Sequence, residues 1–114
     1  REKAIELAKE FNCQATDLNI ESEIRDFDII INTTSVGMKP LENETPIPTK
    51  FITKKQIVFD IIYVPLETKL LKEAKKRGAK IVRGVEMLLH QGTAQFEIFT
   101  GHKAPEEVMR KILV

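Results

Sequence analysis

Three loops hold the residue types that could do chemistry, and each follows a short apolar run typical of a strand. Asn32–Met38 places four hydrogen-bonding side chains ahead of a glycine, Tyr63–Glu67 begins with a phenol, and Arg83–Met87 contains Gly84. Open α/β sheets bind their ligands beyond the carboxyl ends of the strands. A crevice lined by hydroxyl groups, a phenol and closely approaching backbone suits a flat polar ligand.

Each of these features also has a purely structural interpretation. The hydroxyl groups of Thr34 or Ser35 could bond the backbone of their own turn. Gly84 could serve a tight turn and nothing more, and Tyr63 could be an edge aromatic residue with a hydrated hydroxyl group. The residues alone therefore leave a binding crevice and an ordinary loop edge open as alternatives.

Other classes of site find little support in the sequence. Ser35 has no histidine close to it in sequence and lies in no G-x-S-x-G motif, which argues against a serine nucleophile. His90, His102 and Cys13 do not have the spacing of zinc ligands, so we expect no metal site. Neither a G-x-G-x-x-G loop nor a P-loop lysine motif occurs in these residues.

Composition and charge are typical of one globular domain, because 42% of the 114 residues are hydrophobic and 31% are charged. A net charge of +1 gives no reason to expect a nucleic acid or a membrane as partner. We interpret the basic stretch Lys69–Arg83 as a solvated helix face. No apolar run approaches the roughly 18 residues of a membrane span. Cys13 is the single cysteine, which excludes an internal disulfide and favours a cytoplasmic setting.

Hydrophobic spacing predicts strands that alternate with helices. This order indicates an α/β fold: a doubly wound parallel sheet with flanking helices and additional C-terminal helices. A right-handed crossover should join the second and third strands through the helix between them. We expect helices over residues 2–11 (stopping near Asn12), from Pro65 to Lys76, over 85–99 and over 105–113, a helical turn within 22–27, and strands over 27–31, 57–62 and 79–82.

The apolar positions also predict which faces are buried. The strand over 27–31 ends in three consecutive isoleucines, so we expect both of its faces to be buried. Pro65 suits the first turn of the helix that follows the second strand. The expected core positions of the helices are Ala4, Ile5, Leu7, Ala8 and Phe11; Leu66, Leu70, Leu71 and Ala74; Met87, Leu88, Ala94, Phe96, Ile98 and Phe99; and Val108, Met109, Ile112 and Leu113.

Four stretches, in this order, resemble the C-terminal, NADP-binding portion of the shikimate dehydrogenase family. They are Asp28–Met38, Phe59–Leu71, Gly84–Gln91 and Phe96–Gly101, and Arg1–Phe11 is similar to the family's helix that follows an Asn-Arg-Thr motif. The resemblance covers essentially the whole chain. It implies a partial Rossmann-like, doubly wound parallel sheet with flanking helices that binds NADP. The implied enzyme reduces 3-dehydroshikimate to shikimate by hydride transfer in the chorismate route to aromatic amino acids.

The resemblance further implies a set of binding residues. Lys3 matches a basic position near the adenosine 2′-phosphate, and Gly84 matches the residue whose carbonyl group meets the nicotinamide carboxamide. Tyr63 and Gln91 match residues that hydrogen-bond shikimate. Gln91 follows Gly84 by seven residues, close to two helical turns, so both can face one cleft. The other implied cofactor contacts are Thr33, Thr34, Ser35 and Val36 beside the ribose and nicotinamide, Ile61 beside the nicotinamide ring, and Met87, which with Leu88 begins the helix that lines the cleft.

This sequence also departs from the family's pattern. The family's Gly-rich phosphate loop and Asn-Arg-Thr motif are not in it, nor are the catalytic Lys and Asp, which belong to an N-terminal domain. We therefore expect residues 1–114 to be the C-terminal portion of an NADP-binding domain that acts with the missing N-terminal part. Alone, it should be inactive and should bind NADP weakly or not at all. An exposed sheet edge should promote self-association, or a homodimer. Thr33 stands where a small residue is usual, and Glu86 where a glycine is common.

Three alternatives to this assignment remain open, the last of which is a globular domain with no ligand site. The first is a quinate/shikimate dehydrogenase that uses NAD, which Lys3 disfavours because a cation at that position suits a 2′-phosphate. The second is a non-catalytic binding module that uses half of the Rossmann fold, because a fold by itself does not determine a function.

Overall fold

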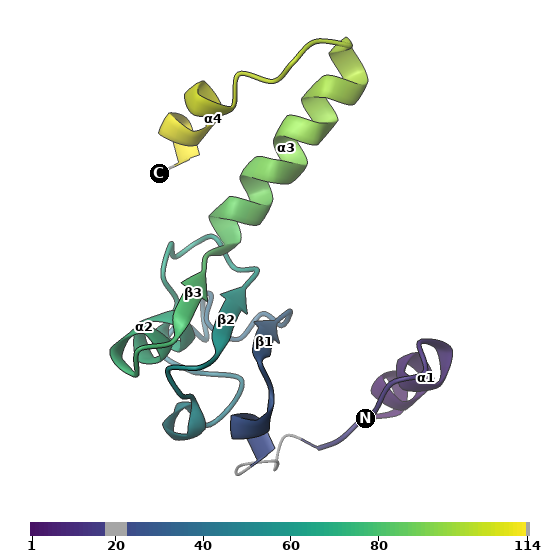
Figure 1. The fold of residues 1–114 in the computed structure, drawn as a ribbon, viewed down its shortest axis with the longest axis vertical. Helices are drawn as coiled ribbons and strands as arrows, with labels where there is room; N and C mark the ends of the chain where they lie inside the picture. The colour runs from purple at the N-terminus through teal and green to yellow at the C-terminus, as the bar shows by residue number, and fades with distance from the viewer. Residues whose placement is uncertain (18–22, 114) are drawn as a thin grey trace.

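The computed structural model describes residues 1–17 and 23–113. Strands and helices alternate through the middle of the chain, and two helices follow the last strand (Figure 1). The 3-10 helix η1 confirms the predicted helical turn, whose first residue, Ser22, lies outside the described residues. In chain order the elements are α1 (Glu2–Glu10), η1 (Glu23–Asp26), β1 (Ile29–Asn32), the 3-10 helix η2 (Thr49–Phe51), β2 (Ile57–Asp60), α2 (Lys69–Lys76), β3 (Lys80–Val82), α3 (Gly84–Thr100) and α4 (Glu106–Leu113).

The strands of the described chain form one parallel sheet in the order β1-β2-β3, which confirms the predicted α/β fold. Val58 in β2 lies opposite Ile30 in β1 and Ile81 in β3, so these three side chains share one face of the sheet. Helix α2 connects β2 to β3 and packs on this face (Figure 1). The side chains of α2 that are buried in this core are Leu70, Leu71 and Ala74.

The prediction that both faces of the first strand are buried is wrong. Ile29 and Ile31 are 56% and 54% exposed, whereas Ile30 packs against the core. The reason is that β1 is an edge strand of this sheet and α2 covers the face that carries Ile30. Strand β1 also begins two residues later than expected, at Ile29.

Helix α2 begins at Lys69 and not, as predicted, at Pro65. Thr68 is its N-cap, and the hydroxyl oxygen of Thr68 accepts a hydrogen bond from the backbone N–H of Leu71 at 3.4 Å. A capping side chain of this kind satisfies one of the donors that the first helical turn leaves unpaired. Leu66 therefore lies in the loop ahead of the helix, where it is 43% exposed and not part of the buried face.

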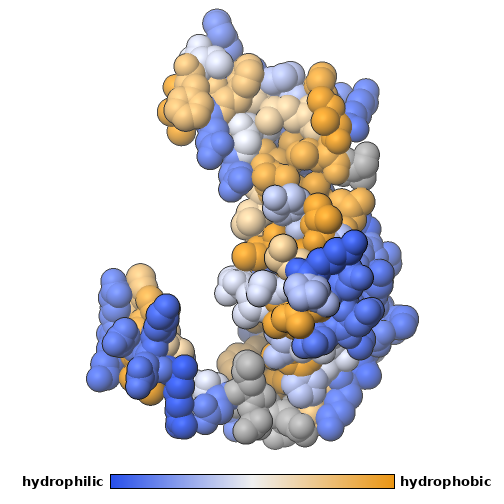
Figure 2. Space-filling model, turned by 180° about the vertical axis from the view of Figure 1, so that it is seen from behind, coloured by the Kyte–Doolittle hydropathy of each residue, from blue (hydrophilic) through white to orange (hydrophobic). Residues whose placement is uncertain are grey.

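Helix α3 extends beyond the sheet, and α4 folds back beside it (Figure 1). Consequently most of the predicted core positions of α3 are exposed, and its buried apolar side chains are those of Val85 and Leu89 instead. Figure 2 shows apolar side chains gathered over these two helices. The predicted core positions that prove to be exposed are Met87, Ala94, Phe96, Ile98 and Phe99 in α3 and Val108 and Ile112 in α4.

Helix α1 stands apart from the sheet in Figures 1 and 2, and Ala8 is the one buried position of its apolar stripe. The other members of the stripe are exposed, so the prediction that they form a core is wrong. They are exposed because no other described element packs closely enough on α1 to cover them. The helix ends near the predicted stop, and Asn12 adopts a φ of 50°. None of the helices in the described ranges is both long and apolar enough to span a membrane.

Candidate functional site

A crevice of about 380 Å³ opens where β1 and β2 end. Two of the three predicted loops, those after β1 and β2, contribute its walls. The loop after β1 contributes mainly hydroxyl-bearing side chains, and the segment after β2 contributes mainly apolar ones together with a phenol. The lining residues are Thr33, Thr34, Ser35, Met38, Ile61, Ile62, Tyr63 and Val64.

Asn32, the last residue of β1, determines the shape of the first loop. Its side-chain Oδ1 accepts hydrogen bonds from the backbone N–H of Thr34 at 3.0 Å and from the Thr34 hydroxyl at 2.8 Å. Its Nδ2 donates to the carbonyl oxygen of Val36 at 3.0 Å, and the backbone N–H of Val36 donates to the Thr34 hydroxyl at 3.1 Å. The Thr34 hydroxyl group therefore bonds within its own turn, as the structural alternative for this residue predicted. Thr33 and Ser35 remain exposed at the crevice.

Asp60, at the end of β2, is fully buried and was not among the residues that the sequence analysis selected. Its Oδ1 accepts from Asn32 Nδ2 and from the backbone N–H of Ile62, both at 3.1 Å, and its Oδ2 accepts from the Thr68 hydroxyl at 2.7 Å. A buried carboxylate needs such partners, since burying an unpaired charge is costly. The available signal was a single acidic residue inside the apolar run that ends in Ile61 and Ile62.

Tyr63 follows β2 at the rim of the crevice and is 49% exposed. Ile61, two residues earlier, lines the same crevice and is half-buried. An apolar side chain beside an accessible phenol can contact a flat ring and donate a hydrogen bond to a polar substituent. These two predicted residues are therefore placed together by the structure.

Gly84, the first residue of α3, lies against the backbone at the end of β2. A Cβ atom at this position would lie 2.5 Å from the carbonyl oxygen of Ile62 and closer still to that of Ile61. Such a distance is far inside van der Waals contact. The glycine thus serves a close approach of two backbones, and this approach brings the start of α3 to the crevice end of the sheet.

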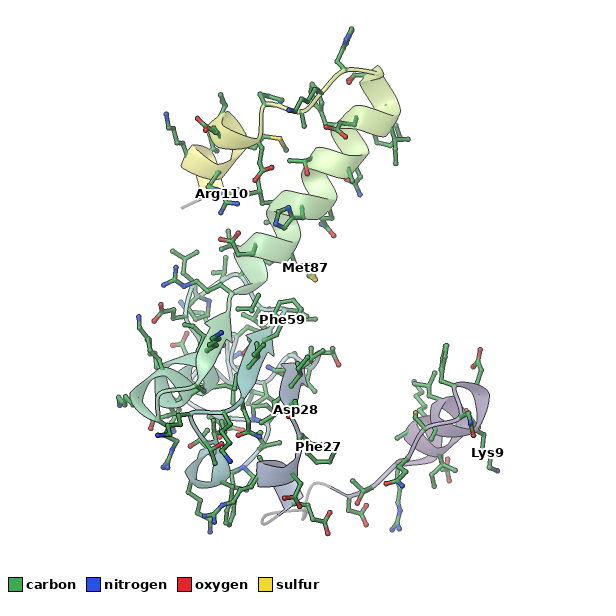
Figure 3. The ribbon with its side chains drawn as sticks, in the orientation of Figure 1. Lys9, Phe27, Asp28, Phe59, Met87 and Arg110 are labelled. Atoms are coloured by element: carbon green, nitrogen blue, oxygen red, sulfur yellow. The ribbon has the colours of Figure 1, made fainter. Side chains whose placement is uncertain are left out.

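Met87 and Gln91 lie on α3 at a spacing of four residues, so they share one side of the helix. Both are exposed. Figure 3 shows the side chain of Met87 on the side of α3 away from Arg110 in α4. Leu88 is half-buried, and Val36 is half-buried in its loop. Lys3 is exposed on α1, and α1 stands apart from the ends of β1 and β2 (Figure 1).

Two ion-pair clusters hold the elements around α3. Arg110 in α4 donates to both carboxylate oxygens of Glu86 at 2.8 and 2.9 Å and to Glu106 at 3.2 Å. The hydrogen bonds with Glu86, and then those with Glu106, raise the pKa of the Arg110 guanidinium. Glu86 thus anchors α4 to the first turn of α3. Arg83 makes the second cluster, donating to Glu67 Oε1 from Nε at 3.1 Å and also from its NH2 group.

The Glu67–Arg83 ion pair should stabilise the protein at neutral pH and not in acid. The hydrogen bond from Arg83 lowers the pKa of the Glu67 carboxyl below its ordinary value of 4.5. A carboxyl with a lowered pKa contributes stability above its unfolded-state pKa, and this stability is lost as the pH falls through the folded-state pKa. We expect a double-mutant cycle of Glu67→Gln and Arg83→Gln, measured by urea unfolding, to show coupling at pH 7 that disappears in acid. Equal coupling at both pH values would contradict this.

A larger hollow of about 790 Å³ lies along α2 and contains none of the predicted site residues. Charged side chains dominate its lining, among them Lys69, Lys72, Lys75 and Lys76, which are exposed. This agrees with the interpretation of the basic stretch as a solvated helix face. Within the described ranges, no three His, Cys, Asp or Glu side chains gather as metal ligands would.

Comparison with known protein families gives one match. The family description is the Shikimate 5′-dehydrogenase C-terminal domain, and it matches residues 84–114. A shikimate dehydrogenase (NADP(+)) of Methanococcus maripaludis is 48% identical over 124 residues, which cover 99% of this chain and 43% of that protein. The chain therefore spans less than half of the length of this curated relative.

Solved structures with this fold include relatives with bound ligands. A shikimate 5-dehydrogenase of Thermus thermophilus, in complex with NADP(H) and shikimate, is 30% identical with a TM-score of 0.86, over 98% of this chain and 41% of that one. A quinate dehydrogenase of Corynebacterium glutamicum, in complex with NAD, is 32% identical with a TM-score of 0.87, over 96% of this chain and 42% of that one.

Proposed function

This chain belongs to the shikimate dehydrogenase family, as a C-terminal portion of such a protein, and we propose that the full-length protein reduces 3-dehydroshikimate to shikimate with NADPH. In this proposal residues 1–114 are the C-terminal portion of the cofactor-binding domain. The reaction would lie on the chorismate route to aromatic amino acids. The missing N-terminal part would supply the phosphate-binding loop and the acid–base groups.

The observation that carries the proposal is the convergence of Thr33, Ser35, Ile61 and Tyr63 on one crevice at the carboxyl ends of β1 and β2. This is where doubly wound sheets hold nucleotide cofactors. The residues present fit a nicotinamide ring, because the crevice combines the apolar side chain of Ile61 with the hydroxyl-bearing side chains of Thr33 and Ser35. Relatives with this fold bind NADP(H) with shikimate or bind NAD.

Each group of residues has a separate task in this proposal. Ile61 packs beside the ring, and the loop Thr33–Val36 supports the ribose. The backbone carbonyl of Gly84 accepts from the carboxamide, and the exposed Met87 closes the cleft from α3. The bound cofactor supplies the hydride. Lys3 would meet the adenosine 2′-phosphate only if α1 lies close to the cofactor in the full-length protein.

Substrate recognition would come from Tyr63 and Gln91. The phenol donates or accepts one hydrogen bond at the rim, and the amide of Gln91 can do both for a hydroxyl or carboxylate group. Their role is orientation, since hydride transfer requires the substrate carbon to be held close to the nicotinamide ring. A quinate dehydrogenase that uses NAD is the second candidate function, favoured by the likeness to the Corynebacterium glutamicum enzyme.

The test is an assay of the full-length protein and its Tyr63→Phe variant. We expect NADP-dependent oxidation of shikimate by the wild type, and a kcat/KM for shikimate lowered by about tenfold in Tyr63→Phe, as expected for one lost hydrogen bond in a closed site. The KM for NADP should stay unchanged, because the phenyl ring keeps the crevice wall. Stronger activity with quinate and NAD would instead support the second candidate, and no activity with either pair would refute both.

A further inference from the structure

The buried pair Asn32–Asp60 is not assigned any role by the proposed contacts, yet it lies directly beneath the crevice. The two residues are opposite each other in the β1–β2 register and are 3% and 0% exposed. They lie on the α2 side of the sheet, because Ile30 and Val58, two residues earlier in each strand, belong to that core. Thr33 and Ile61, the next residues along, line the crevice.

A continuous chain of hydrogen bonds runs from the cap of α2 to the loop at the crevice. The Thr68 hydroxyl, which accepts from the Leu71 N–H, donates to Asp60 Oδ2 at 2.7 Å. Asp60 Oδ1 accepts from Asn32 Nδ2 at 3.1 Å. Asn32 Oδ1 then accepts from the N–H and the hydroxyl of Thr34. One rigid chain therefore joins the helix α2, the end of β2 and the loop Thr33–Val36.

The chemistry of the amide explains why asparagine occupies position 32. A neutral amide offers an acceptor to Thr34 and donors to Val36 and Asp60 at the same time, whereas a carboxylate has no donor. The other end of the loop, at Gly37, lies beside Thr68, a member of the same hydrogen-bond chain. Gly37 adopts a φ of 115°, and a Cβ atom there would lie 3.2 Å from Cγ2 of Thr68. One end of the loop is therefore bonded to Asp60 through Asn32, and the other end, at Gly37, packs against Thr68.

We propose that Asn32, anchored by Asp60 and Thr68, is a positioning residue that holds the loop Thr33–Val36 in the conformation that binds the nicotinamide cofactor. This inference rests on the proposed function. Asn32 itself does not contact the cofactor, since it is almost fully buried. Its effect comes from keeping the loop preorganised, because a site that must be ordered during binding loses affinity.

Gln56 provides a matched control at the opposite end of β2. It is 1% exposed and is equally well connected: its Nε2 donates to the carbonyl oxygens of Ile24 and Phe27, and its Oε1 accepts from the N–H of Thr53. Replacing Gln56 therefore breaks a buried polar cluster of the same kind, far from the crevice. Both replacements should lower stability, so a stability measurement cannot distinguish a positioning role from a purely structural one. The affinity for the cofactor can, because only Asn32 supports the crevice loop.

The experiment compares Asn32→Ala and Gln56→Ala in the full-length protein, with the Kd for NADPH and backbone hydrogen exchange as readouts. We expect both variants to unfold at lower temperature. Only Asn32→Ala should raise the Kd for NADPH, by about tenfold or more, and accelerate exchange at the N–H groups of Thr34 and Val36. The kcat at saturating NADP should change less than the KM for NADP.

A second pair of variants keeps the test decisive if Asn32→Ala does not fold. Thr68→Val removes the hydroxyl group at the α2 end of the hydrogen-bond chain and should weaken NADPH binding. Thr68→Ser keeps the hydroxyl group and should bind NADPH as the wild type does. Equal Kd values for the Asn32 and Gln56 variants, or for the two Thr68 variants, would overturn the positioning role alone. A wild type that neither binds NADPH nor oxidises shikimate would overturn the proposed function.

Discussion

Replacing Gly84 by alanine is expected to destabilise the protein by about 3 kcal/mol, the upper range for forcing an extra carbon into packed surroundings. The new Cβ would overlap the carbonyl groups of Ile61 and Ile62. These are backbone atoms at the end of a strand, so no side-chain rotation can relieve the overlap. Helix α3 would have to move away from the end of β2, and with it Met87 and Gln91. We therefore expect the proposed shikimate and NADP contacts to be lost together with the stability.

The control for this variant is Gly92→Ala in the same helix. A Cβ at Gly92 would lie 3.3 Å from Cε of Met109, the mobile end of a flexible side chain. Alanine also favours a helix interior over glycine, by roughly 0.5–1 kcal/mol. Urea unfolding should therefore show a large loss for Gly84→Ala and a small change of either sign for Gly92→Ala. Similar losses in both variants would mean that general packing of α3, and not the close approach at Gly84, accounts for the effect.

Replacing Asp60 by alanine is expected to remove about 3–5 kcal/mol of stability, because it leaves three buried donors without their acceptor. These donors are Asn32 Nδ2, the backbone N–H of Ile62 and the hydroxyl of Thr68. The Asn32–Thr34 turn would lose its anchor in the sheet, and the N-cap of α2 would lose its support. We therefore expect the first crevice loop and the first turn of α2 to loosen together.

Asp28→Ala is the matched control, because Asp28 is an exposed aspartate at the other end of the same pair of strands (Figure 3). Exposed substitutions of this kind usually change stability by less than about 0.5 kcal/mol. Unfolding in urea gives the difference directly, and hydrogen exchange at Thr34, Val36 and Leu71 shows where the structure loosens. A loss below about 1 kcal/mol for Asp60→Ala would contradict the account of Asp60 as a required acceptor.

The prediction of the elements succeeded where local spacing decides the structure. Alternating apolar runs and helical stripes identified the strands, α2, α3 and α4, and the Lys-Arg-Gly sequence predicted the end of α2, where Gly78 adopts a φ of 81°. The prediction failed for buried faces. Ile31 in β1 and Phe99 in α3 are exposed, because their burial depends on which other element packs there.

The sequence by itself determined the parallel α/β fold and the three loops at the strand ends, because these depend on residue type, spacing and order along the chain. It also carries the four stretches that resemble shikimate dehydrogenases. Only the tertiary structure decided how the loops combine. It brought Ile61, Tyr63, Thr33 and Ser35 together in one crevice and placed Gly84 against the backbone that follows β2. It also joined Asn32, Asp60 and Thr68 in one buried network. The physical reason is that Asn32 and Asp60 are 28 residues apart in sequence, and they become hydrogen-bond partners only because strand pairing places them opposite each other.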